Sequence, residues 1–192
     1  MIKQLPMTTY YHGSSVLFDR FDLAHALEGD GKVKFGYGVY VTSSYRSAAH
    51  YAGANPSARQ HYVYTVEIPE KTEDDYIAFK QPVQPAIVKR AEAKLGVLIP
   101  EKKTVDGKEF RKHLAKQLTG KVDLEGEKAA AEFLLGIGVE LIEWPYNWKN
   151  PDLGTNRAVL DDSKVKIIKV EEVALDKKQQ LIEGSQRLVK QF

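Results

Sequence analysis

The sequence predicts an α+β domain with mixed or antiparallel β-sheets and a helical segment in its middle. Short β-rich runs occupy both ends of the chain, and helical patterns gather between residues 80 and 136. The regular strand–helix–strand alternation that builds a parallel sheet is absent. The 192 residues, 43% hydrophobic and 28% charged, have the length and composition of one globular domain.

The first part of the chain carries three predicted strands. Residues 8–14 form an apolar run that ends in a Gly-Ser turn, and residues 38–42 and 61–68 are rich in β-branched and aromatic side chains. The polar stretch 28–32 predicts a flexible loop. In between, Phe18, Phe21 and Leu23 are expected to anchor the core.

The first predicted helix covers residues 45–52, with Ser43 or Ser44 as its N-cap and Gly53 as its end. Three further helices are predicted within a helical insertion over residues 80–136. Their apolar residues recur at three- and four-residue spacings, and each is followed by glycine. These helices are centred on residues 87–95, 110–118 and 126–135.

Three strands and a helix are predicted after the insertion. The strands cover residues 139–144, 157–160 and 165–173, and the last two are separated by a turn at 161–163. Apolar residues from Leu181 to Phe192 recur at helical intervals, so residues 176–192 predict a C-terminal helix docked on a domain of residues 1–175.

Charge is unevenly distributed along a chain whose formal net charge is only +2. Residues 80–121 hold eleven Lys or Arg against four Asp or Glu, a local net charge of +7. This segment is interpreted either as solvated helices or as a surface that meets nucleic acid or an acidic protein.

Several classes of site are excluded or disfavoured by composition and motif. The absence of cysteine excludes disulfides, thiolate metal sites and a cysteine nucleophile. The five histidines lack metal-ligand spacing, so no metal is expected. P-loop, Rossmann and nucleophile-elbow signatures are missing. With no apolar run long enough to span a membrane and no signal-peptide pattern at the start, a cytoplasmic location is expected.

The remaining candidate site combines His, Gly and Tyr. His12-Gly13-Ser14 ends a predicted strand, and Gly36-Tyr37-Gly38-Val39-Tyr40-Val41 leads into a small-residue helix that carries Tyr51. A glycine backbone can pair with an amide, tyrosine rings can stack on a flat ring, and histidine can bind a sugar hydroxyl. The same residues also occur as ordinary core features, so spacing alone leaves both readings open.

These motifs resemble the ADP-ribosyltransferases of the poly(ADP-ribose) polymerase or diphtheria-toxin type, and most closely the bacterial and phage branch found in polyvalent proteins. The His-Gly-Ser motif, the Gly-x-Gly-hydrophobic-Tyr motif and the helix that ends Ala49-His50-Tyr51 stand in matching order. The third family motif is matched weakly by the run Asn156-Arg157-Ala158-Val159-Leu160-Asp161. The resemblance covers most of residues 8–170 and implies a split sheet of the ADP-ribosyltransferase type.

The resemblance implies a role for each matching position toward NAD⁺, the expected co-substrate. His12 would bind a ribose hydroxyl, Gly13 the nicotinamide amide, and Ser14 a nicotinamide or ribose oxygen. Tyr40 and Tyr51 would stack on the nicotinamide ring, and Ser47 or Ala48 falls where some relatives place a serine. The implied catalytic set is His12, Tyr40 and Asn156, and the implied NAD⁺-binding set is His12, Gly13, Ser14, Tyr40, Ser47 and Tyr51.

Asn156 departs from the glutamate that the family uses to orient the nicotinamide ribose and assist the acceptor. An amide can bind a ribose hydroxyl but cannot act as a base, so mono-ADP-ribosyl transfer is expected rather than chain elongation. Asp152, Asp161 and Asp162 are nearby carboxylates that lie off the pattern, and Asp161 is alternatively a turn residue.

The sequence therefore predicts an NAD⁺-dependent mono-ADP-ribosyltransferase that releases nicotinamide and modifies an unknown macromolecule, as toxins, effectors and phage host-modifying enzymes of the family do. The alternatives are an NAD⁺- or ADP-ribose-binding module with weak or no catalysis, an NAD⁺ glycohydrolase, and an RNA 2′-phosphotransferase. The last shares the fold, but its additional histidine and arginine motifs are not found.

Overall fold

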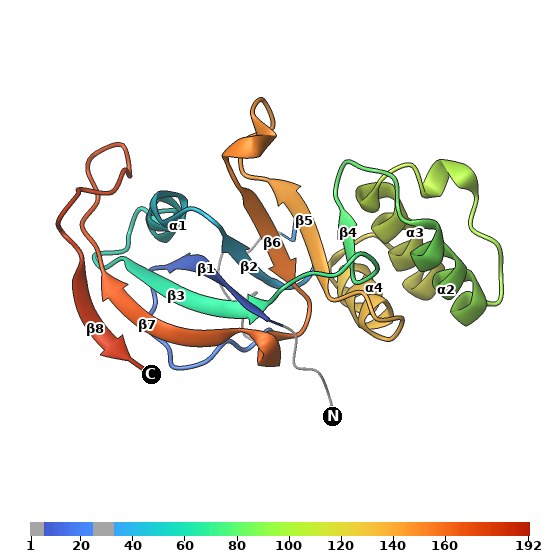
Figure 1. Ribbon diagram of the computed structural model, residues 1–192, viewed down its shortest axis with the longest axis horizontal. Helices are drawn as coiled ribbons and strands as arrows, with labels where there is room; N and C mark the ends of the chain where they lie inside the picture. Colours follow the sequence, from blue (N-terminus) through green and yellow to red (C-terminus); the bar gives the residue numbers. More distant parts are fainter. Residues whose placement is uncertain (1–5, 25–32) are drawn as a thin grey trace.

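The computed structural model describes residues 6–24 and 33–192, and the predicted loop at 28–32 lies outside these ranges. The described chain forms one mixed sheet of eight strands together with four α-helices, which agrees with the predicted α+β class (Figure 1). The strands are β1 (Met7–Ser14), β2 (Val39–Thr42), β3 (Tyr62–Pro69), β4 (Tyr76–Ala78), β5 (Leu141–Pro145), β6 (Thr155–Val159), β7 (Lys166–Glu172) and β8 (Arg187–Gln191). The helices are α1 (Tyr45–Ala52), α2 (Pro85–Leu95), α3 (Gly107–Thr119) and α4 (Leu124–Leu135), with 3₁₀ turns η1 (Glu101–Lys103), η2 (Pro151–Leu153) and η3 (Asp162–Lys164).

The sheet consists of two four-stranded halves that meet at one point. Its strand order is β4-β5-β6-β2-β1-β3-β7-β8, with β4 and β5 parallel and every other described pairing antiparallel. In the described pairing of β1 with β2, Tyr11 opposite Thr42 is the sole rung, whereas β1 pairs with β3 along eight residues. The two central strands therefore diverge soon after they meet.

The helical insertion forms α2, α3 and α4, which gather at the β4 end of the sheet (Figure 1). α3 begins at the N-cap Asp106, whose side chain accepts a hydrogen bond from the amide of Glu109, and ends at Gly120 in the left-handed region. Phe110 and Leu114, four residues apart on α3, are fully buried in the core. The predicted 3.6-residue spacing thus marks the face that packs inward.

α1 packs against β1 and β3 and begins at Ser44, one of the two predicted N-caps. Ala48, Ala49 and Ala52 are buried with at most 1% exposure, so this helix lies close to the sheet. Its close approach places the end of the helix beside the point where β1 and β2 separate.

The predicted C-terminal helix is wrong, because the tail forms the edge strand β8 paired with β7 (Figure 1). Gly184, with a φ of 79°, forms a turn within the stretch predicted as helix. Every residue of β8 is exposed, so the helical spacing of its apolar residues does not mark a buried face. Backbone pairing with β7 and the ion pairs of Arg187 with Glu172 and of Lys190 with Asp19 hold the strand.

Candidate functional site

A cavity of about 380 Å³ lies where the two halves of the sheet diverge. Five of the residues predicted from the sequence line it together, although they come from four elements and span 144 positions of the chain. They are His12 and Gly13 of β1, Tyr40 of β2, Tyr51 of α1 and Asn156 of β6. The volume lies within the range of about 300–1,000 Å³ that is usual for small-molecule sites.

Two predicted residues do not line this cavity. The Ser14 hydroxyl accepts a hydrogen bond from the amide of Val16 at 3.0 Å, which stabilises the turn after β1. Ser47 is buried in α1, and its Oγ has no hydrogen-bond partner among the described residues. Ala48, the alternative to Ser47, is fully buried and also lies outside the cavity lining.

His12 lies across the gap between the two strands. Its Nδ1 is 2.7 Å from the backbone oxygen of Tyr40, and because a carbonyl only accepts, Nδ1 carries the proton. Its ring packs edge-on against Phe21 with the centroids 5.0 Å apart. Burial lowers the pKa of His12, and the hydrogen bond to Tyr40 opposes that shift only in part. His12 is therefore neutral at pH 7, with Nε2 as an acceptor.

Gly13 is required by packing as well as by any ligand. A Cβ at this position would lie 1.8 Å from the carbonyl oxygen of Ala48 and 2.7 Å from the amide nitrogen of Ala52. Only a residue without a side chain allows α1 to approach β1 this closely. The small residues of α1 and Gly13 form one close contact at the wall of the cavity.

Tyr40 contributes a ring to the cavity, while its hydroxyl is occupied by the preceding turn. The hydroxyl donates to the Gly36 carbonyl at 2.8 Å and accepts from the amide of Phe35 at 3.0 Å. Burial raises the pKa of Tyr40 to about 12. The side chain is thus suited to stacking rather than to proton transfer, and its ring packs edge-on against Trp144 at 5.4 Å.

Tyr51 extends from the end of α1 with 52% of its surface exposed. Burial of the remainder raises the pKa of Tyr51, Tyr146 adds to the rise, and the neighbouring Asn156 side chain opposes it. An exposed aromatic ring at the mouth of a cavity can close over a flat ligand.

Asn156 is only 4% exposed, and its Oδ1 has no hydrogen-bond partner among the described residues. A buried acceptor without a donor from the protein is rare and is able to bind a water or a ligand. Here the acceptor belongs to a residue in the cavity wall. A ligand hydroxyl or amide in the cavity would satisfy it.

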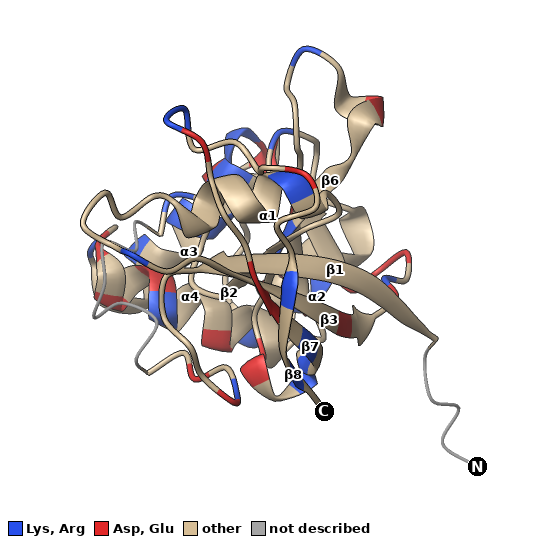
Figure 2. Ribbon diagram, turned by 90° about the vertical axis from the view of Figure 1, so that its left-hand side faces the viewer, with Lys and Arg blue, Asp and Glu red and all other residues tan. Residues whose placement is uncertain are grey.

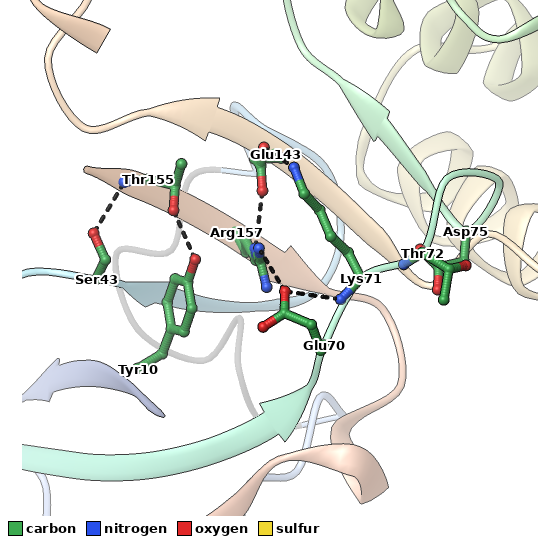
Figure 3. Close-up of polar contacts among 9 residues, drawn as sticks. All are labelled: Tyr10, Ser43, Glu70, Lys71, Thr72, Asp75, Glu143, Thr155 and Arg157. Carbon is green, nitrogen blue, oxygen red and sulfur yellow. Dashed lines mark hydrogen bonds and ion pairs between the residues drawn. The ribbon is translucent and has the colours of Figure 1, made fainter. Parts of the chain in front are cut away.

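Thr155 and Arg157, the neighbours of Asn156 on β6, make polar contacts with side chains of other strands (Figure 3). Arg157 is buried, and its Nε donates to Glu143 at 2.9 Å on the adjacent strand β5. The Thr155 hydroxyl is 2.6 Å from that of Tyr10. Because side chains alternate along a strand, the polar side chains of Thr155 and Arg157 lie on one face of β6. The side chain of Asn156 lies on the opposite face, toward the cavity.

Sequence reasoning missed six residues that complete the lining. Phe35 stacks on Trp144 with the ring centroids 4.1 Å apart, and the two form an aromatic wall beside Tyr40. Phe35 adjoins the predicted glycine motif, which was the available signal, whereas Trp144 was recognised only as a strand residue. The missed residues are Tyr11, Lys34, Phe35, Val41, Thr42 and Trp144.

None of the alternative carboxylates reaches the cavity. Asp161 accepts hydrogen bonds from the amide and hydroxyl of Ser163, which confirms the predicted turn role. Asp162 accepts from the amide of Leu23 at 2.7 Å, and Asp152 lies in η2. None of the described lining residues is a carboxylate, and Lys34 is the sole full charge among them.

Comparison with known proteins gives no match, either to a family model or to a curated sequence. Over residues 6–24 and 33–192, no group of three or more His, Cys, Asp or Glu has an arrangement that could hold a metal ion. The helices within the same ranges are all too short or too polar to cross a bilayer.

Proposed function

We propose that this chain is an NAD⁺-dependent mono-ADP-ribosyltransferase of the toxin, effector or host-modifying kind. The observation that carries the proposal is the convergence of His12, Gly13, Tyr40, Tyr51 and Asn156 on one cavity. The sequence assigns three motifs, separated by up to 144 positions, to one ligand, and residues of all three line one space. The near-complete split between β1 and β2 also agrees with the split sheet implied by the resemblance.

The cavity offers a partner for each part of a nicotinamide riboside. The backbone of Gly13 would pair with the carboxamide, and the rings of Tyr40 and Tyr51 would hold the pyridine ring. Stacking of this kind contributes about 0.5–1.5 kcal/mol beyond area burial. The unpartnered Oδ1 of Asn156 and the neutral His12 would accept hydrogen bonds from ribose hydroxyls. Lys34 supplies a positive charge that suits the pyrophosphate.

The reaction needs little acid–base chemistry from the protein. The bond between ribose C1 and the nicotinamide nitrogen breaks, and nicotinamide leaves as a neutral amide with the bonding electron pair. The acceptor forms the new bond to C1 with its own lone pair, and any proton on the attacking atom goes to solvent. The developing positive charge on the sugar would be stabilised by the Asn156 carbonyl dipole.

The absence of a carboxylate from the described lining favours a second candidate, a module that binds NAD⁺ or ADP-ribose without transferring it. Asn156 would then serve recognition alone. An NAD⁺ glycohydrolase, in which water is the acceptor, is the third outcome that the same cavity permits.

Nicotinamide release from NAD⁺, measured by chromatography with and without cell lysate, tests these candidates. Release that requires lysate supports transfer, release without lysate supports hydrolysis, and a raised Tm without release supports the binding module. A ligand at 100 times its Kd stabilises the fold by about 2.7 kcal/mol, which a thermal scan detects. The absence of both release and stabilisation contradicts the proposed site.

Substitution of His12 by Ala is expected to abolish release or the Tm shift. The matched control is His61→Ala, because His61 lies outside the cavity lining and its Nδ1 is 3.1 Å from the Ala52 backbone oxygen. Equal rates in both variants would show that the cavity is not the site.

A further inference from the structure

A second and larger concavity, of about 720 Å³, lies beside the cavity and is called here the basic groove. It is formed by α3, the start of α4, the end of β4 and the segment around Lys34. Its cationic side chains are Lys34, Lys80, Lys108, Arg111 and Lys112. Four of these five belong to the basic stretch 80–121, and Lys34 comes from an earlier part of the chain. The other basic residues of the stretch do not line the groove.

The positive charge of the basic groove is available to a ligand. Among the described residues, its four lysines form no ion pair with a carboxylate. The two carboxylates of the lining are both engaged, since Asp123 caps α4 and Glu127 pairs with Arg111 at 2.7 Å. Along the rest of the ribbon, Lys and Arg alternate with Asp and Glu (Figure 2).

Arg111 gives the groove an inner donor. It is 2% exposed, and its Nη1 has no hydrogen-bond partner among the described residues. Its Nη2 donates to the Lys34 backbone oxygen at 3.1 Å. An arginine buried in this way, with an unused donor in the lining of a concavity, is typical of a site for an oxyanion such as phosphate.

Aromatic rings accompany these charges. Trp148 is 49% exposed at the edge of the groove, and its ring lies 6.1 Å from that of Phe79. An exposed indole next to lysines is the combination with which proteins bind single-stranded nucleic acid, because bases stack on the ring while cations contact the phosphates. An acidic protein surface would use the cations but has no flat bases for Trp148.

The basic groove adjoins the cavity. Lys34 and Phe35 line both spaces, so a chain bound in the groove would lie beside the point where the sheet diverges. A concavity of this volume can admit a flexible strand or its end, whereas a rigid duplex would have to rest on the outside.

We infer that the basic groove binds single-stranded nucleic acid, and that this strand is the acceptor for the ADP-ribose held in the cavity. The acceptor role rests on the proposed function, whereas the binding does not. Trp148 and Phe35 stack on bases, and Lys108, Lys112 and Arg111 contact phosphates.

The test is the fluorescence anisotropy of a labelled single-stranded 12-mer, measured without NAD⁺ at several salt concentrations. The wild-type chain is expected to bind the 12-mer with an affinity that falls as salt rises. The Lys108→Glu/Lys112→Glu variant should weaken binding at least tenfold, and Trp148→Ala should weaken it about fivefold or more. At constant salt, stacking losses of this size agree with about 1–3 kcal/mol per base.

The matched control is Lys89→Glu/Lys116→Glu. It makes the same change in net charge, within the same basic stretch, at exposed lysines that do not line the groove. This control should change the affinity by less than twofold. Equal weakening by both double variants would overturn the inference, because bulk charge would then suffice.

The nature of the partner is tested by competition. An unlabelled single strand should displace the probe at concentrations well below those at which duplex or poly-glutamate displaces it. Stronger competition by the duplex or by poly-glutamate, or the absence of any binding, overturns the inference.

The acceptor role is tested by incubating the chain with labelled NAD⁺ and the same 12-mer. Label on the oligonucleotide, lost in Lys108→Glu/Lys112→Glu, supports it. Nicotinamide release with lysate but without label on a bound 12-mer overturns the acceptor role while leaving the proposed function intact. If no nicotinamide is released under any condition, the proposed function fails, and anisotropy still decides whether the groove binds the strand.

Discussion

The amide oxygen of Asn156 is buried in the cavity wall without a donor from the described residues. Removal of this side chain should leave the fold nearly as stable as before, because Oδ1 has no partner to lose and the other contact of the amide is with the half-exposed Tyr51 side chain. We therefore expect Asn156→Ala to change the free energy of unfolding by less than about 0.5 kcal/mol. Nicotinamide release should fall about 100-fold, since one preorganised dipole at the reacting sugar is removed.

The control for Asn156→Ala is Thr65→Val, which removes another buried oxygen without a hydrogen-bond partner, at a position outside the cavity lining. It should alter neither denaturant unfolding nor nicotinamide release. A stability loss of 2 kcal/mol or more in Asn156→Ala would show that the amide supports the fold rather than a ligand.

The histidine buried between the two central strands makes stability depend on pH. Because burial lowers the pKa of His12 in the folded state, the unfolded chain binds the proton more readily. Stability is thus greatest above the ordinary histidine pKa of 6.5 and falls as the pH drops below it. We expect the Tm to fall between pH 7 and pH 5, and His12→Gln to reduce that fall.

His113 contributes in the same direction, since burial also lowers its pKa and the nearby Lys103 adds to the shift. The Tm of the double variant His12→Gln/His113→Gln should therefore depend least on pH. A single variant whose Tm falls as steeply as that of the wild type would show that His12 is hydrated rather than buried.

At the scale of elements, the contact of α1 with β1 depends on Gly13. The added Cβ of Gly13→Ala would meet the backbone of Ala48 at 1.8 Å, and backbone cannot move aside as a side chain can. We expect the free energy of unfolding to fall by about 3 kcal/mol, as in strongly overpacked cores. Denaturant titration followed by circular dichroism measures this loss.

Gly136→Ala is the matched control. Its added Cβ would lie 2.0 Å from the flexible end of Lys94, and every other contact given for it is longer than 3 Å. Gly136 has an ordinary helical φ of −65°, so alanine should change stability by less than about 1 kcal/mol. Equal effects of the two alanines would mean that α1 can move away from β1 without loss.

Sequence patterns predicted the elements whose periodicity coincides with burial. Phe110 and Leu114 recur at helical spacing and are buried, so α3 was predicted correctly. The tail failed because Leu188, Val189 and Phe192 are exposed, and their spacing follows no packed face. An edge strand of this kind forms by backbone pairing with β7, which leaves no mark in side-chain spacing.

Motifs likewise predicted the parts of the candidate site that lie on short stretches of chain. His12 and Gly13 are adjacent, and Tyr40 lies on β2 shortly before α1, which carries Tyr51. Phe35 and Trp144 were missed because their contact at 4.1 Å joins segments 109 positions apart. Such a contact is decided by how β5 and the loop before β2 are placed, and not by local composition.

At the scale of the whole molecule, a buried ion pair within the helical insertion is linked to the rest of the fold through Arg111. Arg111 of α3 pairs with Glu127 of α4 at 2.7 Å, and both side chains are at most 6% exposed. Burial raises the pKa of Glu127, and Arg111 opposes that rise. Through its bond to the Lys34 carbonyl, Arg111 also holds the segment that lines the cavity.

We expect Glu127→Gln to lower the free energy of unfolding by about 3–5 kcal/mol, because it leaves a buried guanidinium without its counter-charge. Near- and far-ultraviolet circular dichroism should lose signal in one transition, since the insertion and the sheet share a core. The control Lys103→Gln breaks the more exposed ion pair of Lys103 with Glu109, whose charged atoms are 3.2 Å apart. It should lower the free energy of unfolding by at most about 1 kcal/mol. Two separate transitions would show that the insertion unfolds independently.

The lone rung between Tyr11 and Thr42 has a mechanical consequence. Few backbone bonds join the two four-stranded halves, so the angle between them is held mainly by side-chain contacts, such as Tyr10 with Thr155 and His12 with the Tyr40 carbonyl. His12 and Gly13 belong to one half, and Tyr40 and Asn156 to the other. A molecule bound by both sets of residues would connect the two halves. Occupancy of the cavity would therefore restrict the movement of one half of the sheet relative to the other.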